Sequence, residues 1–393
     1  MARLRVNSNR SMKLILLIPH MADGGAEKTL SDLSFNLGLG EIVLVVFQER
    51  QGYPFRGRLI SMNLPIERQS IFARVCGFIR RTYRFRRILQ KERPDCVISF
   101  MGEANFINAL VSPRPILTVH NHLSSVSYLR GRLEALAFTG LVKALYRRAT
   151  IITVSEAVKD DLVTNFGLPE NRIVVIVTAI DSQEIRRKAT EEVVCPWDRN
   201  APVIITAGRL HPQKGQWHLL RAFAQVRKKT ICRLAILGTG ELENYLRRLA
   251  NELGIEKDVY FLGWQENPFK FLAKADLFVQ PSISEGLALV VMEAMACRLP
   301  VIATNCPGPP EIIAPDGEEE CGILVPPVDE NMYSADDPCT EGELAMADAI
   351  LRMLLNGDLR QRFISAGLAR LRDLDRAAFL DKYRRVIQAV AKT

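Results

Sequence analysis

Short apolar runs alternate with longer stretches of helical periodicity along the first half of the chain. The runs lie at Met12–Ile18, Ile42–Phe47, Cys96–Phe100, Ile116–His120 and Ile151–Val154. Runs of about four to eight apolar residues indicate strands buried on both faces, and the stretches between them, such as Glu27–Leu37, indicate connecting helices. The alternation predicts a doubly wound α/β domain built on a parallel sheet.

The same pattern starts again after a polar, proline-containing stretch at residues 191–202. Strands are expected at Val203–Ala207, Arg233–Leu237, Val259–Phe261, Leu277–Gln280, Val301–Ala303 and Ile323–Val325. We therefore predict an α/β fold of two doubly wound Rossmann-like domains, residues 1–190 and 195–375, that face each other across a cleft at their strand C-termini. Residues 326–343 are expected to form an acidic surface loop, and a terminal helix at about 376–393 to pack back on the first domain.

Length and composition agree with this organisation. A chain of 393 residues is too long for one core, and 48% hydrophobic with 24% charged residues is typical of a globular enzyme. The longest early apolar run, Leu14–Ile18, is far shorter than the roughly 18 to 20 residues that span a bilayer. The 8 cysteines include no Cys-x-x-Cys pair, so buried thiols are expected rather than disulfides or a zinc site. A cytoplasmic protein is predicted.

Charge distinguishes the two halves. Residues 1–190 carry 28 Lys/Arg against 16 Asp/Glu, a net charge of +12, so the remaining residues carry −4 of the total of +8. A basic domain beside an acidic one suggests that the first domain faces an anionic partner. On charge alone, that partner is nucleic acid, acidic lipid or a phosphorylated substrate.

Two cations follow the first strand of the second half. The segment from Gly208 to Gly215 contains Arg209 and Lys214. Gly208 allows a sharp turn at the strand end, and a guanidinium fork together with a compact ammonium suits a diphosphate. An isolated Arg/Lys pair would be an ordinary basic loop, but the strand C-terminus of a doubly wound sheet favours a ligand site.

Two carboxylates follow a later strand of the same half. Glu285 precedes a helix that starts near Leu289 and Val290, where free backbone N–H groups would attract an anion. Glu293 lies two turns into this apolar helix, where a carboxylate is costly unless it is hydrogen-bonded, for instance by vicinal ribose hydroxyls. The alternative, a glutamate on the solvent side of the helix, is less favoured by its apolar neighbours.

Together these motifs resemble the GT-B retaining glycosyltransferases of family 4. The resemblance rests on Gly208-Arg209, Lys214-Gly215, the Glu285-x7-Glu293 spacing, Gly24-Gly25-Ala26-Glu27, Gly238-Thr239-Gly240, Ala275-Asp276, Pro281-Ser282 and Gly308-Pro309-Pro310-Glu311, and it spans about residues 13–375. It implies a nucleotide-sugar donor held by the second domain and an acceptor held by the first.

The resemblance also implies roles for single residues. Arg209 and Lys214 would neutralise the leaving diphosphate, Glu293 would bind the ribose, and Glu285 would contact donor-sugar hydroxyls during catalysis. The remaining donor-nucleotide contacts would come from Gly208, Gly238, Trp264, Leu289 and Val290. Fixed cations and a helix dipole can stabilise the leaving group without a metal ion. Because Asp373-Leu374-Asp375 is the one Asp-x-Asp and lies among the terminal helices, no metal or cofactor is expected.

The first domain offers further cleft candidates. His120 closes a strand and resembles the family's histidine that contacts the donor sugar, although a structural histidine is the alternative. Gly24 and Gly25 would let backbone approach the acceptor or the diphosphate, with Glu27 beside them. Asn105, in a segment that weakly resembles lipid-linked oligosaccharide transferases, is similarly placed. Glu156 is expected to face the cleft without an assigned role.

The segment Arg68–Arg93 combines apolar residues at near-helical spacing with nine cations. A basic amphipathic helix is typical of proteins that bind an anionic membrane surface, each cation contributing roughly 1 kcal/mol. An ordinary helix that packs on the sheet and has a solvated basic face is an equal alternative.

These features predict transfer of a hexose or N-acetylhexosamine from a UDP-sugar to a polyprenyl-diphosphate-linked glycan in bacterial surface polysaccharide or glycan assembly. The enzyme would be peripheral at the inner face of the cytoplasmic membrane. A transferase with a soluble acceptor, a nucleotide-sugar epimerase on the same fold and a Rossmann dehydrogenase are alternatives, but the first loop lacks the G-x-G-x-x-G of a dehydrogenase. No nucleic-acid recognition module is present, and the acidic second half argues against nucleic-acid binding.

Overall fold

The protein consists of two compact units in a computed structural model that describes residues 12–392 except 23, 51, 67–69, 125–131, 199, 316, 318–320 and 375. One unit is Met1–Thr178 with Ala377–Thr393, and the other is Ala179–Arg376. Residues 179–190, including helix α7 (Ser182–Ala189), therefore belong to the second unit. The predicted boundary at residue 190 had placed them in the first. The reason is local packing: the Asn267 side-chain amide donates to the Lys188 carbonyl (2.9 Å), and α7 lies against α10 (Phe269–Leu272).

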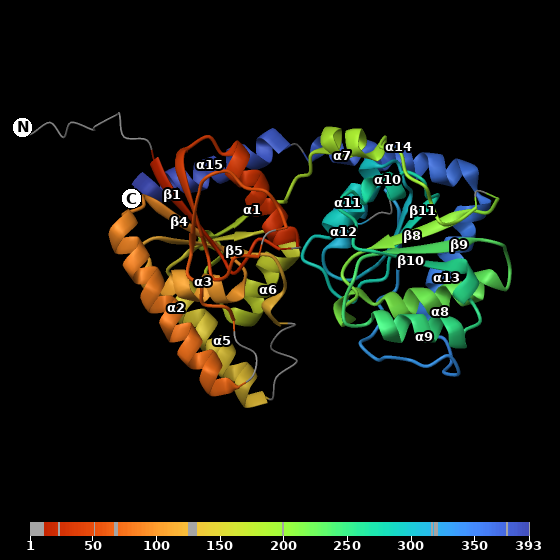
Figure 1. Ribbon diagram of the computed structural model, residues 1–393, viewed down its shortest axis with the longest axis horizontal. Helices are drawn as coiled ribbons and strands as arrows, with labels where there is room; N and C mark the ends of the chain where they lie inside the picture. The colour runs from red at the N-terminus through yellow and green to blue at the C-terminus, as the bar shows by residue number, and fades with distance from the viewer. Residues whose placement is uncertain are drawn as a thin grey trace, which may run out of the picture. The chain divides into compact units, whose positions relative to one another are not determined.

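The first unit is built on a parallel sheet of seven strands in the order β3-β2-β1-β4-β5-β6-β7 (Figure 1). The strands are β1 (Met12–Ile18), β2 (Gly40–Val46), β3 (Arg58–Ser61), β4 (Cys96–Phe100), β5 (Pro115–Val119), β6 (Thr150–Thr153) and β7 (Ile173–Val175). The two edge strands, β3 and β7, are absent from the sequence-based prediction. The central strands β1, β4, β5 and β6 match the apolar runs that predicted them.

Helices cover both faces of this sheet. They are α1 (Gly25–Asn36), α2 (Ile71–Glu92), α3 (Gly102–Val111), α5 (Arg132–Tyr146), α6 (Glu156–Phe166), the short η1 (Glu170–Arg172) and α15 (Arg376–Lys392). Phe85 of α2 and Ile107 of α3 pack with Ile15 and Leu17 of β1, so α2 and α3 cover one face. On α15, the Arg384 guanidinium donates to the two carbonyls that end α1, which places α15 beside α1.

The second unit repeats this architecture with six parallel strands in the order β10-β9-β8-β11-β12-β13. The strands are β8 (Val203–Ala207), β9 (Arg233–Leu237), β10 (Val259–Gly263), β11 (Leu277–Gln280), β12 (Val301–Thr304) and β13 (Ile323–Val325). The remaining helices are η2 (Pro212–Lys214), α8 (Gln216–Arg227), α9 (Glu243–Glu252), η3 (Glu256–Asp258), α11 (Leu289–Ala296), α12 (Pro309–Ile313), α13 (Glu341–Leu355) and α14 (Gly357–Asp373). The order of strands reverses between β8 and β11, which is where a doubly wound sheet binds ligands.

The segment between β13 and α13 is fastened to α8. Arg221, buried in α8, donates to the carbonyls of Asp337 (3.0 Å) and Pro338 (2.8 Å), and it is ion-paired with Glu343 (2.9 Å). His218 contacts the same carboxylate (2.8 Å). Burial acts to raise the pKa of Glu343, but the hydrogen bonds from His218 and Arg221 outweigh it and hold this pKa below its usual range. This turn-rich segment is thus held by buried charged groups on one side, although sequence analysis indicated a plain surface loop.

Candidate functional site

The two loops that follow β8 and β11 meet at the point where the strand order reverses in the second unit. The Ile283 backbone N–H donates to the Gln213 carbonyl (2.9 Å), and the Gln213 side-chain amide donates to the Ser284 carbonyl (2.7 Å). Because β8 and β11 are adjacent parallel strands, both loops leave the same edge of the sheet. The first loop contains Lys214 and the second contains Glu285, so the strand pairing brings these two predicted site residues together.

Glycines permit the close approach of the loops. Gly215 has a φ of 59°, and a Cβ there would overlap the Pro281 carbonyl oxygen. Gly238, after β9, has a φ of 122°, and a Cβ there would overlap the Gly208 carbonyl oxygen. Both positions therefore require glycine for conformational and for steric reasons.

Glu285 is the centre of the polar contacts in this region. Its Oε1 atom accepts hydrogen bonds from the Lys214 Nζ (2.6 Å), the Ser282 Oγ (2.6 Å) and the Gln280 Nε2 (2.8 Å). Only 7% of the residue is exposed, so the carboxylate lies in a site of reduced polarity and is oriented by three donors. The Lys214 side chain remains 26% exposed. Lys214 has further N–H donors and can bind a second anion without leaving Glu285.

Arg209 occupies a different environment from Lys214. Its side chain is 64% exposed and lies 3.5 Å from the Glu241 carboxylate, which also lies 3.5 Å from the His211 imidazole. The two cations therefore pair with different carboxylates, and sequence analysis expected them to bind one diphosphate together. The Arg209 side chain is mostly exposed, whereas the Lys214 side chain is mostly buried.

Helix α11 begins beside this pair of loops. Its N-cap residue, Ala288, adopts a left-handed φ of 62°, and Leu289 and Val290 in the first turn are partly exposed. Glu293 is also partly exposed, although the residues before and after it are buried. The helix thus presents a first turn and one carboxylate to the surface from an otherwise buried segment.

The remaining predicted donor contacts lie on neighbouring strand ends. Trp264 follows β10 and is 56% exposed. The preceding Gly263 accepts a hydrogen bond from the Gly238 N–H (2.8 Å), which joins the ends of β9 and β10. Gly308, ahead of α12, lies against Glu285, because a Cβ there would come within 3.0 Å of the glutamate Cβ.

In the first unit, the loop after β1 folds over the first turn of α1. Glu27 is buried, and its carboxylate lies 3.4 Å from the His20 imidazole. Gly24 is next to this carboxylate, and a Cβ there would collide with it. Gly24, Gly25 and Glu27 therefore form one compact turn in which Glu27 faces inward.

His120 directly follows β5. Both ring nitrogens are buried and lack a hydrogen-bond partner among the residues that the structure describes, and the ring lies 5.8 Å from that of Phe100. Burial lowers the pKa of His120 to about 4, while the Thr118 backbone acts in the opposite direction. His120 is therefore neutral at physiological pH and can donate from one nitrogen and accept at the other.

Two other residues predicted to face the cleft make polar contacts within the first unit. Asn105 is buried, accepts a hydrogen bond from the Ser99 hydroxyl (2.7 Å) and donates to the Thr118 carbonyl (2.8 Å), so its amide joins α3 to β4 and β5. An acceptor contact by Asn105 has no support in this geometry. Glu156 begins α6 and is exposed, where it pairs with Lys159 (3.3 Å).

Models of two protein families match the chain. One is described as Glycosyl transferases group 1 and matches residues 188–336; the other is Glycosyltransferase Family 4 and matches residues 24–184. An uncharacterized glycosyltransferase of Methanocaldococcus jannaschii is 31% identical over an alignment of 338 residues that covers 79% of this chain and 83% of that protein. The chain belongs to glycosyltransferase family 4.

Further comparisons agree with this family. A Campylobacter jejuni protein named N-acetylgalactosamine-N,N'-diacetylbacillosaminyl-diphospho-undecaprenol 4-alpha-N-acetylgalactosaminyltransferase is 28% identical over 329 residues, 81% of this chain and 87% of that protein. The solved structure of Anabaena HepE with UDP and glucose has the same fold, with a TM-score of 0.73 at 18% identity over 96% of this chain and 100% of that one. The predicted GT-B α/β class of this family 4 glycosyltransferase is confirmed. The placement of the two units about a cleft stays a prediction.

Membership of family 4 decides between two of the alternatives that the sequence left open. The protein is a glycosyltransferase and not a Rossmann dehydrogenase. In the described part of the chain, no helix is long and apolar enough to cross a bilayer. Among the same residues, no group of three or more His, Cys, Asp or Glu could hold a metal ion. Of the Asp-x-Asp motif, Asp373 ends α14, and Asp375 lies outside the described residues.

Sequence reasoning missed three contributors to the site of this glycosyltransferase. Gln280 and Ser282 both donate to Glu285, and Glu241 pairs with Arg209. Gln280 could have been found in the sequence, because it is a polar residue at the end of an apolar strand. No local pattern indicates that Ser282 turns back onto a carboxylate three residues later.

Proposed function

We propose that this family 4 glycosyltransferase transfers a hexose or N-acetylhexosamine from a UDP-sugar to a polyprenyl-diphosphate-linked glycan, with retention of configuration and without a required metal. The observation that carries the proposal is the Lys214–Glu285 pair (2.6 Å) at the switch point of the second unit. In the proposed reaction, the cation of this pair would neutralise the leaving diphosphate, and the carboxylate would accept hydrogen bonds from sugar hydroxyls. The site residues named from the sequence, except Asn105, are part of this proposal.

The donor side follows from the chemistry of the leaving group. A nucleoside diphosphate gains negative charge as the glycosidic bond breaks, and preorganised cations and N–H groups stabilise that charge. Lys214, Arg209 and the first turn of α11 would surround it. Glu293, partly exposed on α11, would bind the ribose. HepE, which has the same fold, was solved with UDP, and this supports a UDP-sugar as donor.

The acceptor is inferred from the relative and from α2. The printed name of the Campylobacter jejuni relative gives a diphospho-undecaprenol-linked acceptor for that protein. A lipid-linked acceptor requires the enzyme to reach a membrane surface. We propose that α2 provides this contact, which makes the protein peripheral at the inner face of the cytoplasmic membrane.

The outer side of α2 suits an anionic bilayer. Four large apolar side chains are exposed there at helical spacing: Phe72 (80%), Val75 (51%), Ile79 (59%) and Tyr83 (63%). Next to them, exposed arginines recur at the same spacing: Arg80, Arg84 and Arg87. An apolar stripe flanked by cations inserts into the headgroup region and is attracted by anionic lipid. Arg68, the first residue of the proposed segment, lies outside the described residues.

A donor screen tests the transfer reaction. Purified enzyme, a polyprenyl-diphosphate-linked glycan extract and a panel of UDP- and GDP-sugars are combined, and the released nucleotide is measured. One UDP-sugar should give acceptor-dependent release that EDTA does not reduce, and NMR of the product should show the donor's anomeric configuration. Lys214→Ala should lower kcat/KM at least about hundredfold, whereas Lys228→Ala, an exposed lysine of the same unit, should not. Release from none of these sugars would overturn the proposal.

A vesicle assay tests the membrane contact separately. The triple variant Arg80→Glu, Arg84→Glu, Arg87→Glu should lose binding to phosphatidylglycerol vesicles, because three cations become repulsive anions. A matched variant on the second unit, Lys228→Glu, Lys229→Glu, Arg248→Glu, should bind like the wild type. Both should keep transfer to a detergent-solubilised acceptor. Equal vesicle binding by the two triple variants would rule out α2 as the contact.

A further inference from the structure

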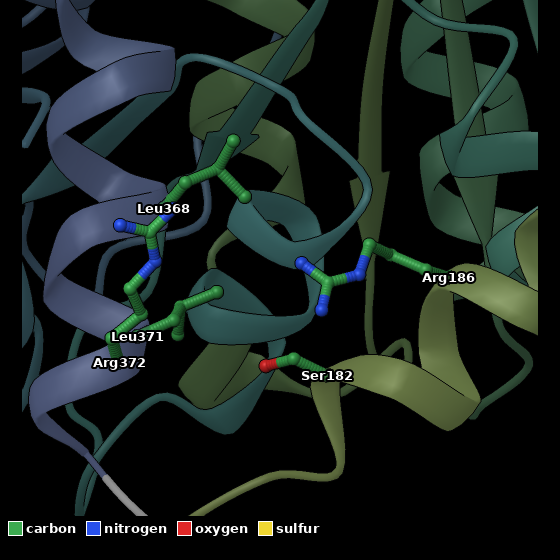
Figure 2. A pocket seen from close by; sticks show the side chains of 5 residues that line it. All are labelled: Ser182, Arg186, Leu368, Leu371 and Arg372. Atoms are coloured by element: carbon green, nitrogen blue, oxygen red, sulfur yellow. The ribbon is translucent and has the colours of Figure 1, made fainter.

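A cavity of about 190 Å³ lies between α7 and α14 in the second unit, away from the loops that carry Lys214 and Glu285. It is lined by Ser182 and Arg186 of α7 and by Leu368, Leu371 and Arg372 of α14 (Figure 2). Ser182 and Arg186 are one helical turn apart, as are Leu368 and Arg372, so each helix turns one face to the gap. In Figure 2 the Ser182 hydroxyl and the Arg186 guanidinium extend from α7 toward the leucines of α14.

The two arginines of this cavity differ from their neighbours in charge pairing. Within the described residues, neither Arg186 nor Arg372 takes part in an ion pair. By contrast, Arg187 pairs with Glu184 (2.7 Å), and Arg376 pairs with Asp181 (2.5 Å). The carboxylates near the start of α7 are therefore already neutralised, and none of the described residues that line the cavity is acidic. Two arginines without an ion-pair partner among the described residues thus flank an apolar floor.

We propose that Ser182, Arg186 and Arg372 bind a phosphate monoester whose organic group rests on Leu368 and Leu371. A guanidinium fork matches two phosphate oxygens, a hydroxyl donates to a third, and a monoester carries close to two negative charges at pH 7. The cavity is smaller than the roughly 300 to 1,000 Å³ of sites for drug-sized ligands, so it suits a small monoester and excludes a nucleotide sugar. The phosphate belongs to a soluble metabolite or to a lipid headgroup.

The position of the cavity gives the bound anion a second effect. Two connections join the units, at residues 178–179 and at residues 376–377. Helix α7 begins just after the first connection, and α14 ends just before the second. An anion held by both Arg186 and Arg372 cross-links these helices and stiffens both connections. This inference goes beyond the transfer reaction and does not depend on the identity of the donor or acceptor.

Calorimetric titration of the full-length protein with butyl phosphate tests the site. Butyl phosphate should bind roughly tenfold more tightly than inorganic phosphate, because the leucines cover part of the alkyl chain. Arg186→Gln and Arg372→Gln should each weaken binding at least tenfold, and Arg372→Lys should lie in between, since lysine keeps the charge and loses the fork. Arg187→Gln, on the same helix but turned elsewhere and paired, should bind like the wild type. Thermal unfolding of each variant verifies that it is folded.

Two further arms separate the site from the donor loops and identify the source of the phosphate. The double variant Arg209→Ala, Lys214→Ala should retain binding, because those cations belong to the other site. Vesicles containing phosphatidic acid that compete with butyl phosphate would identify a lipid headgroup, and lack of competition would identify a soluble ester. Amide hydrogen exchange in residues 179–189 and 366–374 should slow when butyl phosphate binds. The proposal is overturned if folded Arg186→Gln and Arg372→Gln variants bind like the wild type, or if the wild type shows no binding.

Discussion

At the scale of single residues, Glu285 combines burial with three hydrogen bonds on one oxygen. Lys214, Ser282 and Gln280 all donate to Oε1, and the other oxygen is left for a ligand hydroxyl in the proposed reaction. A buried carboxylate with this many donors is fixed in position before the substrate arrives. Such preorganisation is what an electrostatic role in catalysis requires.

Glu285→Gln should therefore damage both activity and stability. The glutamine amide cannot accept from all three donors at once, and Lys214 loses its counter-ion. We expect kcat/KM to fall at least about hundredfold and the free energy of unfolding to fall by about 1–3 kcal/mol. Initial rates and urea denaturation measure the two effects. A variant with wild-type rates would show that this carboxylate does not take part in transfer.

His120 gives a prediction about pH. Its pKa is about 4 in the folded protein, against an ordinary value of 6.5, because burial disfavours the charged ring. The unfolded chain therefore binds a proton at a higher pH than the folded one. Stability is unaffected above about pH 6.5 and falls as the pH drops from 6.5 toward 4, by about 3 kcal/mol in total.

This loss should disappear when the imidazole is removed. In His120→Asn the free energy of unfolding should decline less between pH 6.5 and pH 4 than in the wild type, and the difference between the two curves should level off below pH 4. Urea denaturation at a series of pH values gives both curves. Curves that stay parallel through this range would contradict the depressed pKa.

The sequence singled out the charged residues of the candidate site and missed how they are paired. Arg209, Lys214 and Glu285 stand out because they lie in loops after predicted strands, at the edge where a doubly wound sheet binds ligands. Their partners depend on which strands are adjacent: Lys214 meets Glu285 only because β8 and β11 pair in the middle of the sheet. The sequence also does not reveal the partners of Asn105, because an amide near a strand end can equally turn inward to bind backbone.

At the scale of elements, α2 has two different apolar sides. Phe78, Phe85 and Ile88 pack toward the sheet, whereas Phe72 and Ile79 are exposed on the outer side. The sequence showed an amphipathic helix rich in arginine. It left open whether this helix binds a membrane surface or only packs on the sheet with a solvated basic face. The exposed apolar residues favour a surface contact, and the structure also removes one arginine from that surface.

That arginine is Arg81. It is buried, pairs with Glu103 (2.6 Å), donates to the Pro65 carbonyl (2.6 Å) and lies over the Phe47 ring. Removing it leaves a carboxylate and a carbonyl without their donor, so Arg81→Ala should lower the free energy of unfolding by about 3–5 kcal/mol.

The neighbouring Arg80 is the matched control for this prediction. It is exposed on the outer side of α2, and Arg80→Ala should change stability by less than about 0.5 kcal/mol. Urea denaturation of the two variants should therefore separate them clearly. Equal stabilities would mean that the contacts of Arg81 contribute nothing to folding.

Strands were predictable in proportion to their burial. Central strands such as β1 and β4 are continuous apolar runs because helices cover both of their faces. The edge strands β3 and β7 pair on one side only and are short, so their few apolar residues give little signal. Helix α7 was assigned to the wrong unit because Ile185 is its only buried residue among those described, which leaves no apolar pattern to place it.

At the scale of the whole molecule, the chain builds one architecture twice. Each unit places its first strand in the middle of the sheet, and the strand order reverses beside it. The sequence predicted two domains because the series of apolar runs starts again after residue 202. The return of the chain terminus to the first unit depends on tertiary contacts of α15, which sequence periodicity alone does not specify.

Those contacts lead to a prediction that separates the two units. Arg384 donates to the Leu37 carbonyl (2.8 Å) and the Asn36 carbonyl (2.7 Å), where α1 ends and its carbonyls lack helical partners. Arg384→Ala should destabilise the first unit by about 1–3 kcal/mol. Arg385→Ala removes only an exposed pair with Asp381 and should change stability by less than about 1 kcal/mol.

Thermal unfolding with and without UDP assigns this loss to a unit. In the proposed function UDP binds the second unit, so by mass action it should raise the transition of that unit alone. Arg384→Ala should then lower the transition that UDP does not move, and Arg385→Ala should lower neither. If Arg384→Ala instead lowers the UDP-sensitive transition, then α15 stabilises the nucleotide-binding unit, and the division of the chain at residue 376 does not describe how it unfolds.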